Sequence, residues 1–411
     1  MAVIRPFCAV RPAVEYADKV AALPYDVYNR AEAKKEVERE PLSFLAIDRA
    51  ETQFEDSVSV YAPKVYAKAK ELFEERISQG IFIEDKQSAY YIYQLEMNGR
   101  TQRGIAACAS VDDYLDGTIK KHENTREEKE QDRIRHVDTL SAQTGPIFLA
   151  YRSQATINQL VSKIMETQEP LYDFTAADGI AHRMWKVTEE AVTTLQEAFA
   201  GIQEIYIADG HHRAASAVKV GLKRRKEHPD YDGTEEFNYF LSVLFPDDQL
   251  MIMDYNRCVK DLHGLTKEAF LKAVEECFDV TVLDGAKHPQ AKGQITMYLE
   301  NRWYLLQAKQ ELLAITDPVA ALDVSLLQEY LLKPVLGIED PRTDERIDFI
   351  GGIRGLEELE RRVQTDMTVA FAMYPTSIGE LFAVADAGLL MPPKSTWFEP
   401  KLRSGLLMHR I

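Results

Sequence analysis

The sharpest change of hydrophobic pattern in the chain falls within residues 204–217. Residues 205–208 form a short apolar, β-prone run, which predicts a buried strand. The run breaks at Asp209 and Gly210, and an Ala-rich pattern typical of a helix follows over residues 213–223. This stretch therefore predicts a strand, a polar turn and a helix in immediate succession.

Strands alternate with helices through the rest of residues 1–262. The predicted strands are 4–10, 89–97, 101–110, 146–151, 181–187, 237–245 and 251–257. The predicted helices are 30–40 with Asn29 as N-cap, 61–79, one that follows residues 122–125, 156–166 and 189–200. Asn98-Gly99 is the strongest two-residue signal for a hairpin. The alternation predicts a mixed α/β sheet.

Residues 263–411 show an α+β pattern that predicts a second domain. The predicted elements are helix 265–278, strand 280–283, a hairpin of 294–300 and 303–308 that turns at Asn301-Arg302, helix 323–336, and strands 347–350 and 368–374, each followed by a helix. Residues 388–407 contain two prolines and no periodicity, which predicts an extended tail without regular structure. We expect this tail to return to the active site of the first domain.

Composition and charge narrow the class of protein. The 411 residues hold 49 Lys and Arg against 66 Asp and Glu, a net charge of −17, which disfavours binding to nucleic acid. The four cysteines lie far apart and form no Cys-x-x-Cys pair, so neither a zinc knuckle nor a disulfide framework is indicated. With no signal-peptide pattern and no apolar run of membrane-spanning length, we expect a cytoplasmic protein with no membrane partner.

The predicted turn after residue 208 has the chemistry of a phosphate site. A strand that runs through a polar turn into a helix directs free backbone N–H groups and the positive end of the helix dipole at an anion. Gly210 allows close approach of the backbone, and the planar fork of Arg213 can hold two phosphate oxygens. A plain strand-to-helix turn with two solvated histidines remains the alternative.

Two further polar stretches carry candidate residues. His122-Glu123-Asn124-Thr125 precedes an acidic helix start, but a zinc-protease motif would need histidine at position 126, which is Arg126. A solvated helix start is the alternative. In the tail, Lys394, Ser395, Thr396 and Lys401 lie beside aromatic residues, which suits closure over a phosphorylated ligand; a tail packed by its aromatics is the alternative. The chain contains no Walker phosphate loop.

Four motifs in order resemble one family. They are Pro24-Tyr25-Asp26-Val27, His122-Glu123-Asn124-Thr125, Asp209-Gly210-His211-His212-Arg213, and Met391-Pro392-Pro393-Lys394-Ser395-Thr396 with Pro400-Lys401. Together they resemble the domain of unknown function 1015 family, grouped with the ParB/sulfiredoxin superfamily. His211 replaces the reactive cysteine of sulfiredoxins, and His211-His212-Arg213 differs from the Glu-Arg-Arg of ParB proteins. The Asp-Gly-His-x-Arg form looks most like the free serine kinases.

The resemblance implies a ParB/sulfiredoxin-like mixed-sheet domain and a kinase reaction. The expected reaction is transfer of a phosphoryl group from ATP (or ADP), with Mg²⁺, to free L-serine, giving O-phosphoserine in serine and cysteine metabolism. The expected nucleotide-binding residues are Gly210, His211, Arg213, Lys394, Ser395, Thr396 and Lys401. A homodimer is left open.

The remaining assignments concern the acceptor. We expect Glu123 to be the general base, and Asp209 to orient the substrate or hold Mg²⁺ through water. His212 would donate a hydrogen bond to a phosphate oxygen. The substrate-binding candidates are Asp26 for the ammonium group, Arg126 for the carboxylate, and His122.

Two other functions remain open. One is a metal-dependent phosphatase that acts on phosphoserine or a similar small phosphate ester, with its metal on His211, His212 and Asp209. The other is a nucleotide-binding switch without enzymatic activity.

Overall fold

The computed structural model describes residues 2–411, which form two compact units. The first unit is Met1–Leu250 with Pro400–Ile411, and the second is Met251–Glu399. The predicted domain boundary at residue 262 stays a prediction, because compactness alone does not define an independently folding domain. Each unit is described by itself.

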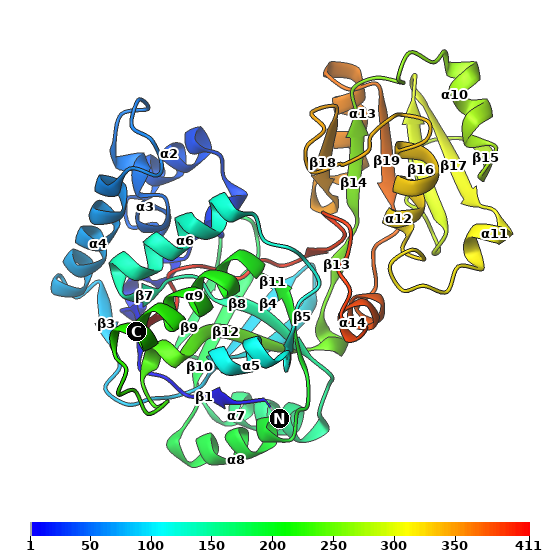
Figure 1. Ribbon diagram of the computed structural model, residues 1–411. Helices are drawn as coiled ribbons and strands as arrows, with labels where there is room; N and C mark the ends of the chain where they lie inside the picture. Colours follow the sequence, from blue (N-terminus) through cyan, green and yellow to red (C-terminus); the bar gives the residue numbers. More distant parts are fainter. Residues whose placement is uncertain (1) are drawn as a thin grey trace. The chain divides into compact units, whose positions relative to one another are not determined.

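A nine-stranded mixed sheet forms the centre of the first unit (Figure 1). In spatial order its strands are β6 (Ile119–Lys120), β11 (Ile205–Asp209), β8 (Ile147–Tyr151), β12 (Tyr239–Pro246), β5 (Arg100–Ser110), β4 (Tyr91–Met97), β10 (Ala181–Lys186) and β9 (Tyr172–Thr175), with β1 (Ile4–Arg5) paired to β5. The pairs β11/β6 and β12/β8 are parallel, whereas β11/β8 and β12/β5 are antiparallel. The predicted mixed fold class is therefore confirmed.

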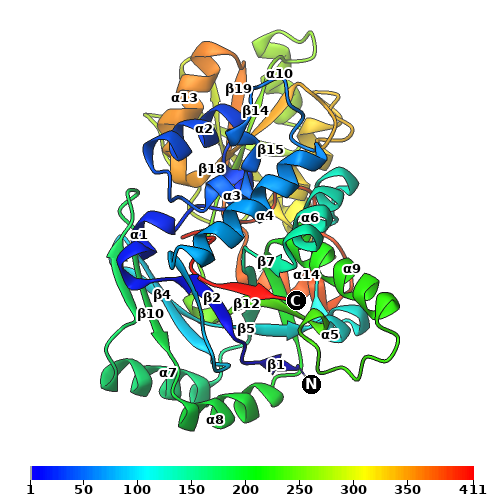
Figure 2. The same cartoon turned by 90° about the vertical axis from the view of Figure 1, so that its left-hand side faces the viewer.

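Helices flank this sheet. They are α1 (Ala17–Val20), α2 (Arg30–Arg39), α3 (Leu45–Asp48), α4 (Pro63–Ser78), α5 (Val111–Asp116), α6 (Glu127–Leu140), α7 (Ala155–Thr167), α8 (Glu189–Ala200) and α9 (His211–Glu227). Short 3-10 helices are η1 (Val14–Tyr16), η2 (Tyr25–Val27), η3 (Ala50–Gln53), η4 (Glu236–Asn238) and η5 (Asp247–Gln249). Helices α7 and α8 lie together near β1, and α6 lies beside α9 (Figure 2). Asn29 caps α2 through a capping box with Glu32, as its position predicts.

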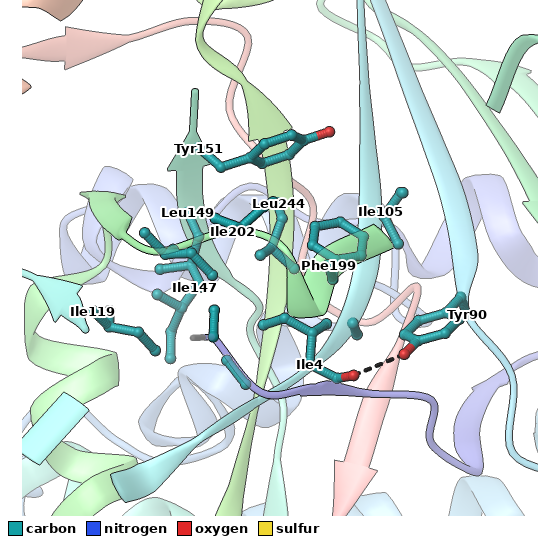
Figure 3. Packing of buried hydrophobic residues seen from close by; sticks show 14 of the residues in the cluster. Ile4, Tyr90, Ile105, Ile119, Ile147, Leu149, Tyr151, Phe199, Ile202 and Leu244 are labelled. Atoms are coloured by element: carbon teal, nitrogen blue, oxygen red, sulfur yellow. Dashed lines mark hydrogen bonds between the residues drawn. The ribbon is translucent and has the colours of Figure 1, made fainter. Parts of the chain in front are cut away.

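The core of the first unit fixes the strand that ends at the predicted turn. On β8, Ile147, Leu149 and Tyr151 are alternate residues, so their side chains point to one face of the sheet (Figure 3). Phe199 of α8 packs into the same core, and the Tyr90 hydroxyl donates to the Ile4 carbonyl at 2.7 Å. Since β11 pairs with β8, its end is held by this core.

A second, four-stranded sheet brings the end of the chain back to the first unit. Its order is β3 (Phe82–Glu84), β2 (Ala9–Pro12), β21 (Met408–Arg410) and β7 (Ala142–Gln143). Buried residues of α3 and α4, including Leu45 and Phe73, form a second core with Met408 of β21. The predicted single strand at 4–10 is wrong, because the chain divides into β1 and β2, which belong to different sheets. Pro6 lies at the break and has no N–H to donate.

The second unit contains an antiparallel six-stranded sheet. Its order is β15 (Phe278–Leu283), β17 (Arg302–Ala308), β16 (Gln294–Leu299), β19 (Val369–Met373), β14 (Tyr255–Val259) and β18 (Ile347–Gly351), with a separate pair of β13 (Ile252–Met253) and β20 (Trp397–Phe398). The helices are α10 (Lys267–Val274), α11 (Gln310–Leu313), α12 (Asp323–Leu327), the 3-10 helix η7 (Gly352–Arg354), α13 (Gly355–Thr365) and α14 (Ile378–Asp386). No helix within residues 2–411 is long and apolar enough to cross a membrane.

Several predicted boundaries need correction. Helix α9 begins at His211 rather than Arg213, because Gly210 makes the turn by itself. The hairpin turns at Glu300-Asn301, which both have positive φ (46° and 58°), and Arg302 already belongs to β17. The tail is not wholly irregular, since β20 pairs with β13.

The predicted strand 251–257 and helix 323–336 are also interrupted. The strand divides into β13 and β14, and the carbonyl of the intervening Asp254 accepts the Gly352 N–H at 2.8 Å. The helix continues beyond α12 as a π-helical turn, η6 (Gln328–Leu332).

Two helical glycines give a matched test of packing. A Cβ added to Gly221 of α9 would lie 2.5 Å from the Phe237 carbonyl oxygen, whereas one on Gly379 of α14 would have 4.0 Å to its nearest atom. We expect Gly221→Ala to lower the free energy of unfolding by about 1–3 kcal/mol because the backbone must shift. Gly379→Ala should leave it unchanged or raise it by about 1 kcal/mol, since alanine favours the helix. Denaturant unfolding measures both; equal effects would contradict the packing at Gly221.

Candidate functional site

The turn at Gly210 leaves the first amides of α9 open. Gly210 adopts the left-handed conformation (φ 95°, ψ 31°) between the end of β11 and the start of α9, which glycine adopts without steric cost. No side chain of residues 2–411 caps the helix, so the N–H groups of His211 and His212 have neither an intrahelical acceptor nor a capping oxygen there. Amides arranged in this way can bind an anion.

Asp209 lies at this turn between two cations. Its Oδ1 accepts a hydrogen bond from the Gly210 N–H at 2.9 Å, and its Oδ2 accepts one from Lys401 Nζ at 3.2 Å. Arg213 Nη2 lies 3.9 Å from the same Oδ2. Burial would raise the pKa of Asp209, but Lys401 and then Arg213 outweigh it and lower that pKa below its ordinary value. Asp209 is therefore ionised at neutral pH.

Arg213 folds back beneath the turn. Its Nη1 donates to the Pro146 carbonyl at 2.5 Å. A Cβ on Gly210 would lie 3.1 Å from Arg213 Nε, and one on Gly145 would lie 3.5 Å from its Cδ, so the side chain runs between two glycines. The side chain is 12% exposed. Because one arm of the guanidinium already has a protein acceptor, its predicted hold on two phosphate oxygens stays a prediction.

His211 turns its side chain inward, toward the loop that contains Glu123. Its Nε2 accepts the His122 N–H at 3.4 Å, and its Nδ1 lies 3.6 Å from Glu123 Oε2. The rings of His122 and His211 meet edge to face, with centroids 4.5 Å apart. An acceptor Nε2 leaves the proton of neutral His211 on Nδ1, where it faces Glu123.

Burial keeps this histidine pair uncharged. It lowers the pKa of His122 to about 4, against the smaller opposing effects of Asp209 and the Ile207 carbonyl. Burial, and next the neighbouring His122, also lowers the pKa of His211 well below its ordinary value. Two buried imidazolium ions in contact would be costly, so both rings are neutral at pH 7.

His212 faces a different group of charges. Burial is the main cause that lowers the pKa of His212, and the positive charge of Lys129 lowers it further. The negative charge of Asp26 raises that pKa. Arg126 also belongs to its electrostatic surroundings. The His212 Nδ1 atom is buried and has no hydrogen-bond partner within residues 2–411. The structure thus brings the predicted residues Asp26 and Arg126 near His212, where both are exposed.

Three predicted tail residues belong to the second unit. The Lys394 ammonium lies 5.5 Å from the centre of the Tyr255 ring, and the Ser395 hydroxyl donates to the Pro392 carbonyl at 2.7 Å. Thr396 is half-buried. The expected role of Lys394, Ser395 and Thr396 at the phosphate turn stays a prediction, whereas Lys401 contacts that turn directly.

The three-residue metal site of the phosphatase alternative is not formed. Among residues 2–411, no three His, Cys, Asp or Glu side chains are grouped so as to hold a metal. His211 and His212 face different neighbours, and both Asp209 oxygens already accept protein hydrogen bonds. Adjacent helical residues point in different directions, so the pair His211-His212 is poorly placed to chelate one ion.

Several supporting contacts could not be predicted from the sequence. Glu130 of α6 is buried, accepts Thr125 Oγ1 at 2.7 Å and forms an ion pair with Lys219 of α9. These contacts tie the loop before α6 to the helix that follows Gly210. The Gly145-Pro146 dipeptide marks a turn in the sequence, but only the fold shows that Arg213 packs against it.

A family profile described as "Protein of unknown function (DUF1015)" matches residues 4–325. The chain belongs to this family. The resemblance to DUF1015 proteins is thus confirmed, while the wider grouping with ParB and sulfiredoxin stays a prediction. A comparison with curated proteins found no match.

Several solved structures share part of the DUF1015 chain's arrangement at low similarity. A free serine kinase in complex with AMP is 15% identical, with 73% of this chain and 91% of that chain covered and a TM-score of 0.36. SbnI with C-terminal truncation from Staphylococcus aureus is 12% identical (73% and 87% covered, TM-score 0.39). A conserved hypothetical protein from Pyrococcus furiosus is 15% identical (74% and 94% covered, TM-score 0.36). Similarities this low carry no argument about function.

The neutral histidine pair predicts a pH dependence. In the unfolded chain His122 takes up a proton near its ordinary pKa of 6.5, whereas in the folded protein its pKa is about 4. Unfolding is therefore favoured as the pH falls from about 6.5 to 4, by up to about 3 kcal/mol from this residue. Histidine-selective NMR should show His122 titrating near pH 4, and His122→Asn should flatten the pH profile of unfolding. Titration of His122 near 6.5 would contradict its burial as a neutral ring.

Proposed function

We propose that this protein is a phosphotransferase that uses ATP to phosphorylate the hydroxyl of free L-serine. The main support for the proposal is the open N-terminus of α9 at Gly210. Lys401 lies beside it, and His211, the first residue of the helix, contacts the Glu123 carboxylate. Phosphoryl transfer needs an anion site and a base at the same place, and this turn supplies candidates for both.

The nucleotide phosphates would lie on the amides of His211 and His212. The helix start offers N–H donors that cost no reorganisation, and Lys401 adds a positive charge. Lys401 is paired with Asp209 at 3.2 Å, so an arriving phosphate would share this cation with the carboxylate. His212 lies in the first turn of α9 and is half-buried, which supports the expected hydrogen bond from its ring to a phosphate oxygen.

Glu123 is the proposed base. In the reaction, the serine oxygen bonds to the γ-phosphorus as the bond between that phosphorus and its bridging oxygen breaks. ADP leaves with the bond electrons, and the hydroxyl proton passes to Glu123 late in a loose transition state. The side chain is 43% exposed, so it is accessible to a substrate. Neutral His211 would orient the carboxylate without neutralising it.

The ammonium and carboxylate groups of the substrate L-serine would bind charged side chains near His212. Asp26 is exposed, and its carboxylate forms no ion pair or hydrogen bond with the part of the chain the structure describes. It would receive the ammonium group, and Arg126 would receive the carboxylate. His122, which is buried, would act by supporting His211 rather than by direct contact.

Mg²⁺ enters the proposal with the nucleotide. Asp209 is the carboxylate at the turn that could hold the ion through water, although Lys401 and Gly210 already engage both of its oxygens. When bound, Mg²⁺ would offset negative charge on the phosphates.

The decisive test is an assay with purified protein. ATP, ADP and CTP are each incubated with and without L-serine and Mg²⁺, and O-phosphoserine is measured by mass spectrometry. O-phosphoserine that forms only with nucleotide supports the kinase. Release of phosphate from added O-phosphoserine without nucleotide would instead identify a phosphatase. Tight nucleotide binding with no turnover on any acceptor would favour a switch.

Replacement of the base gives a sharper expectation. We expect Glu123→Gln to lower kcat by about 10²–10⁴-fold with nucleotide affinity nearly unchanged, because the amide cannot accept the hydroxyl proton. Glu127→Gln is the matched control: Glu127 contacts the neighbouring Gln131 side chain at the exposed start of α6. Full activity of Glu123→Gln would remove Glu123 from the mechanism.

A further inference from the structure

The second unit contains a cavity of about 560 Å³, lined by β14, α12, η6 and β18 together with Pro392 and Pro393. Cavities of this size hold small organic ligands. It lies wholly within Met251–Glu399. The proposed kinase site uses none of its lining residues, so binding of a ligand here is independent of the proposed function.

Arg257 of β14 is a buried cation that lines this cavity. It is 3% exposed and forms no ion pair with any carboxylate in residues 2–411. Its guanidinium donates to the carbonyls of Tyr255 and Lys394, the latter at 3.0 Å, and lies 5.3 Å from the centre of the Phe349 ring. Burial lowers the pKa of Arg257 to about 10, so it stays charged at neutral pH.

This arrangement is costly unless an anion completes it. A buried charge without an opposite charge is unfavourable, and carbonyls and an aromatic ring compensate only in part. The two carbonyls engage two of the five N–H donors of a guanidinium. The remaining donors suit the two oxygens of a carboxylate.

Ser325 of α12 provides an independent observation in the same cavity. It is 5% exposed, and its hydroxyl has no hydrogen-bond partner in the described part of the chain. Buried hydroxyls are nearly always hydrogen-bonded, so this one indicates a missing partner. α12 then passes into the π-helical turn η6, a distortion often found at functional sites.

Acidic side chains limit what the cavity can accept. Its lining also contains the exposed Asp317 and Glu329. Two further carboxylates of the lining are paired: Glu339 with Lys333 at 3.5 Å, and Asp340 with Arg342 at 2.8 Å. This excess of carboxylates disfavours a polyanion such as a nucleotide. It favours a ligand with a cationic group in addition to its carboxylate.

We propose that the second unit binds a small zwitterion of the amino-acid type, whose carboxylate is held by Arg257 and the Ser325 hydroxyl and whose ammonium group faces the acidic part of the lining. The Met391–Thr396 motif then has a role within its own unit: the Lys394 carbonyl holds Arg257, and Pro392 and Pro393 form part of the wall.

The test uses the full chain and two variants. Ser325→Ala removes a hydroxyl that has no partner among the described residues and should leave the melting temperature unchanged. Arg257→Met removes the charge and keeps the apolar stem. Each of the twenty amino acids, and inorganic phosphate, is tested by thermal shift and then by hydrogen exchange, which localises protection along the chain.

We expect at least one amino acid to slow exchange in residues 320–332 of the wild-type protein. Ser325→Ala should weaken this binding about tenfold or more, and Arg257→Met should abolish it. Three results would overturn the proposal: no amino acid protects this segment, Ser325→Ala binds as tightly as the wild type, or phosphate alone protects it. Protection confined to residues 209–215 reports the kinase site and also counts against the proposal.

Discussion

The left-handed turn at Gly210 determines the geometry of the candidate site. A side chain at this position would meet the Arg213 guanidinium and strain the backbone, so only glycine allows β11 to pass directly into α9. That direct passage leaves the helix amides open and places Asp209 beside Lys401. Because β11 packs into the core of the first unit, the turn that follows it is held in one position.

Buried neutral histidines are the second organising feature. His122 and His211 make an edge-to-face contact below the surface, and the outer nitrogen of His211 faces Glu123. Because burial keeps both rings uncharged, His211 faces the carboxylate as a neutral imidazole.

Local patterns predicted the elements well and the long-range contacts poorly. The cap at Asn29, the hairpin at Asn98-Gly99 and the strand before Asp209 follow from rules that act over a few residues. The hydrogen bond from Arg213 to the Pro146 carbonyl joins residues far apart in the sequence, and no local pattern of residues predicts it. For the same reason, the composition of the tail suggested Lys401 as a phosphate ligand but could not indicate its contact with Asp209, and Arg257 was missed.

The return of Pro400–Ile411 to the first unit has a consequence for the order in which the protein is made. The second unit is inserted between Leu250 and Pro400, and both β21 and Lys401 follow it in the chain. A nascent chain on the ribosome can form β11, Gly210 and α9 early. The ion pair between Asp209 and Lys401 can form only after the whole inserted unit has been translated. Throughout that interval Asp209 lacks one of its two cations, and β2 lacks β21 as a neighbour.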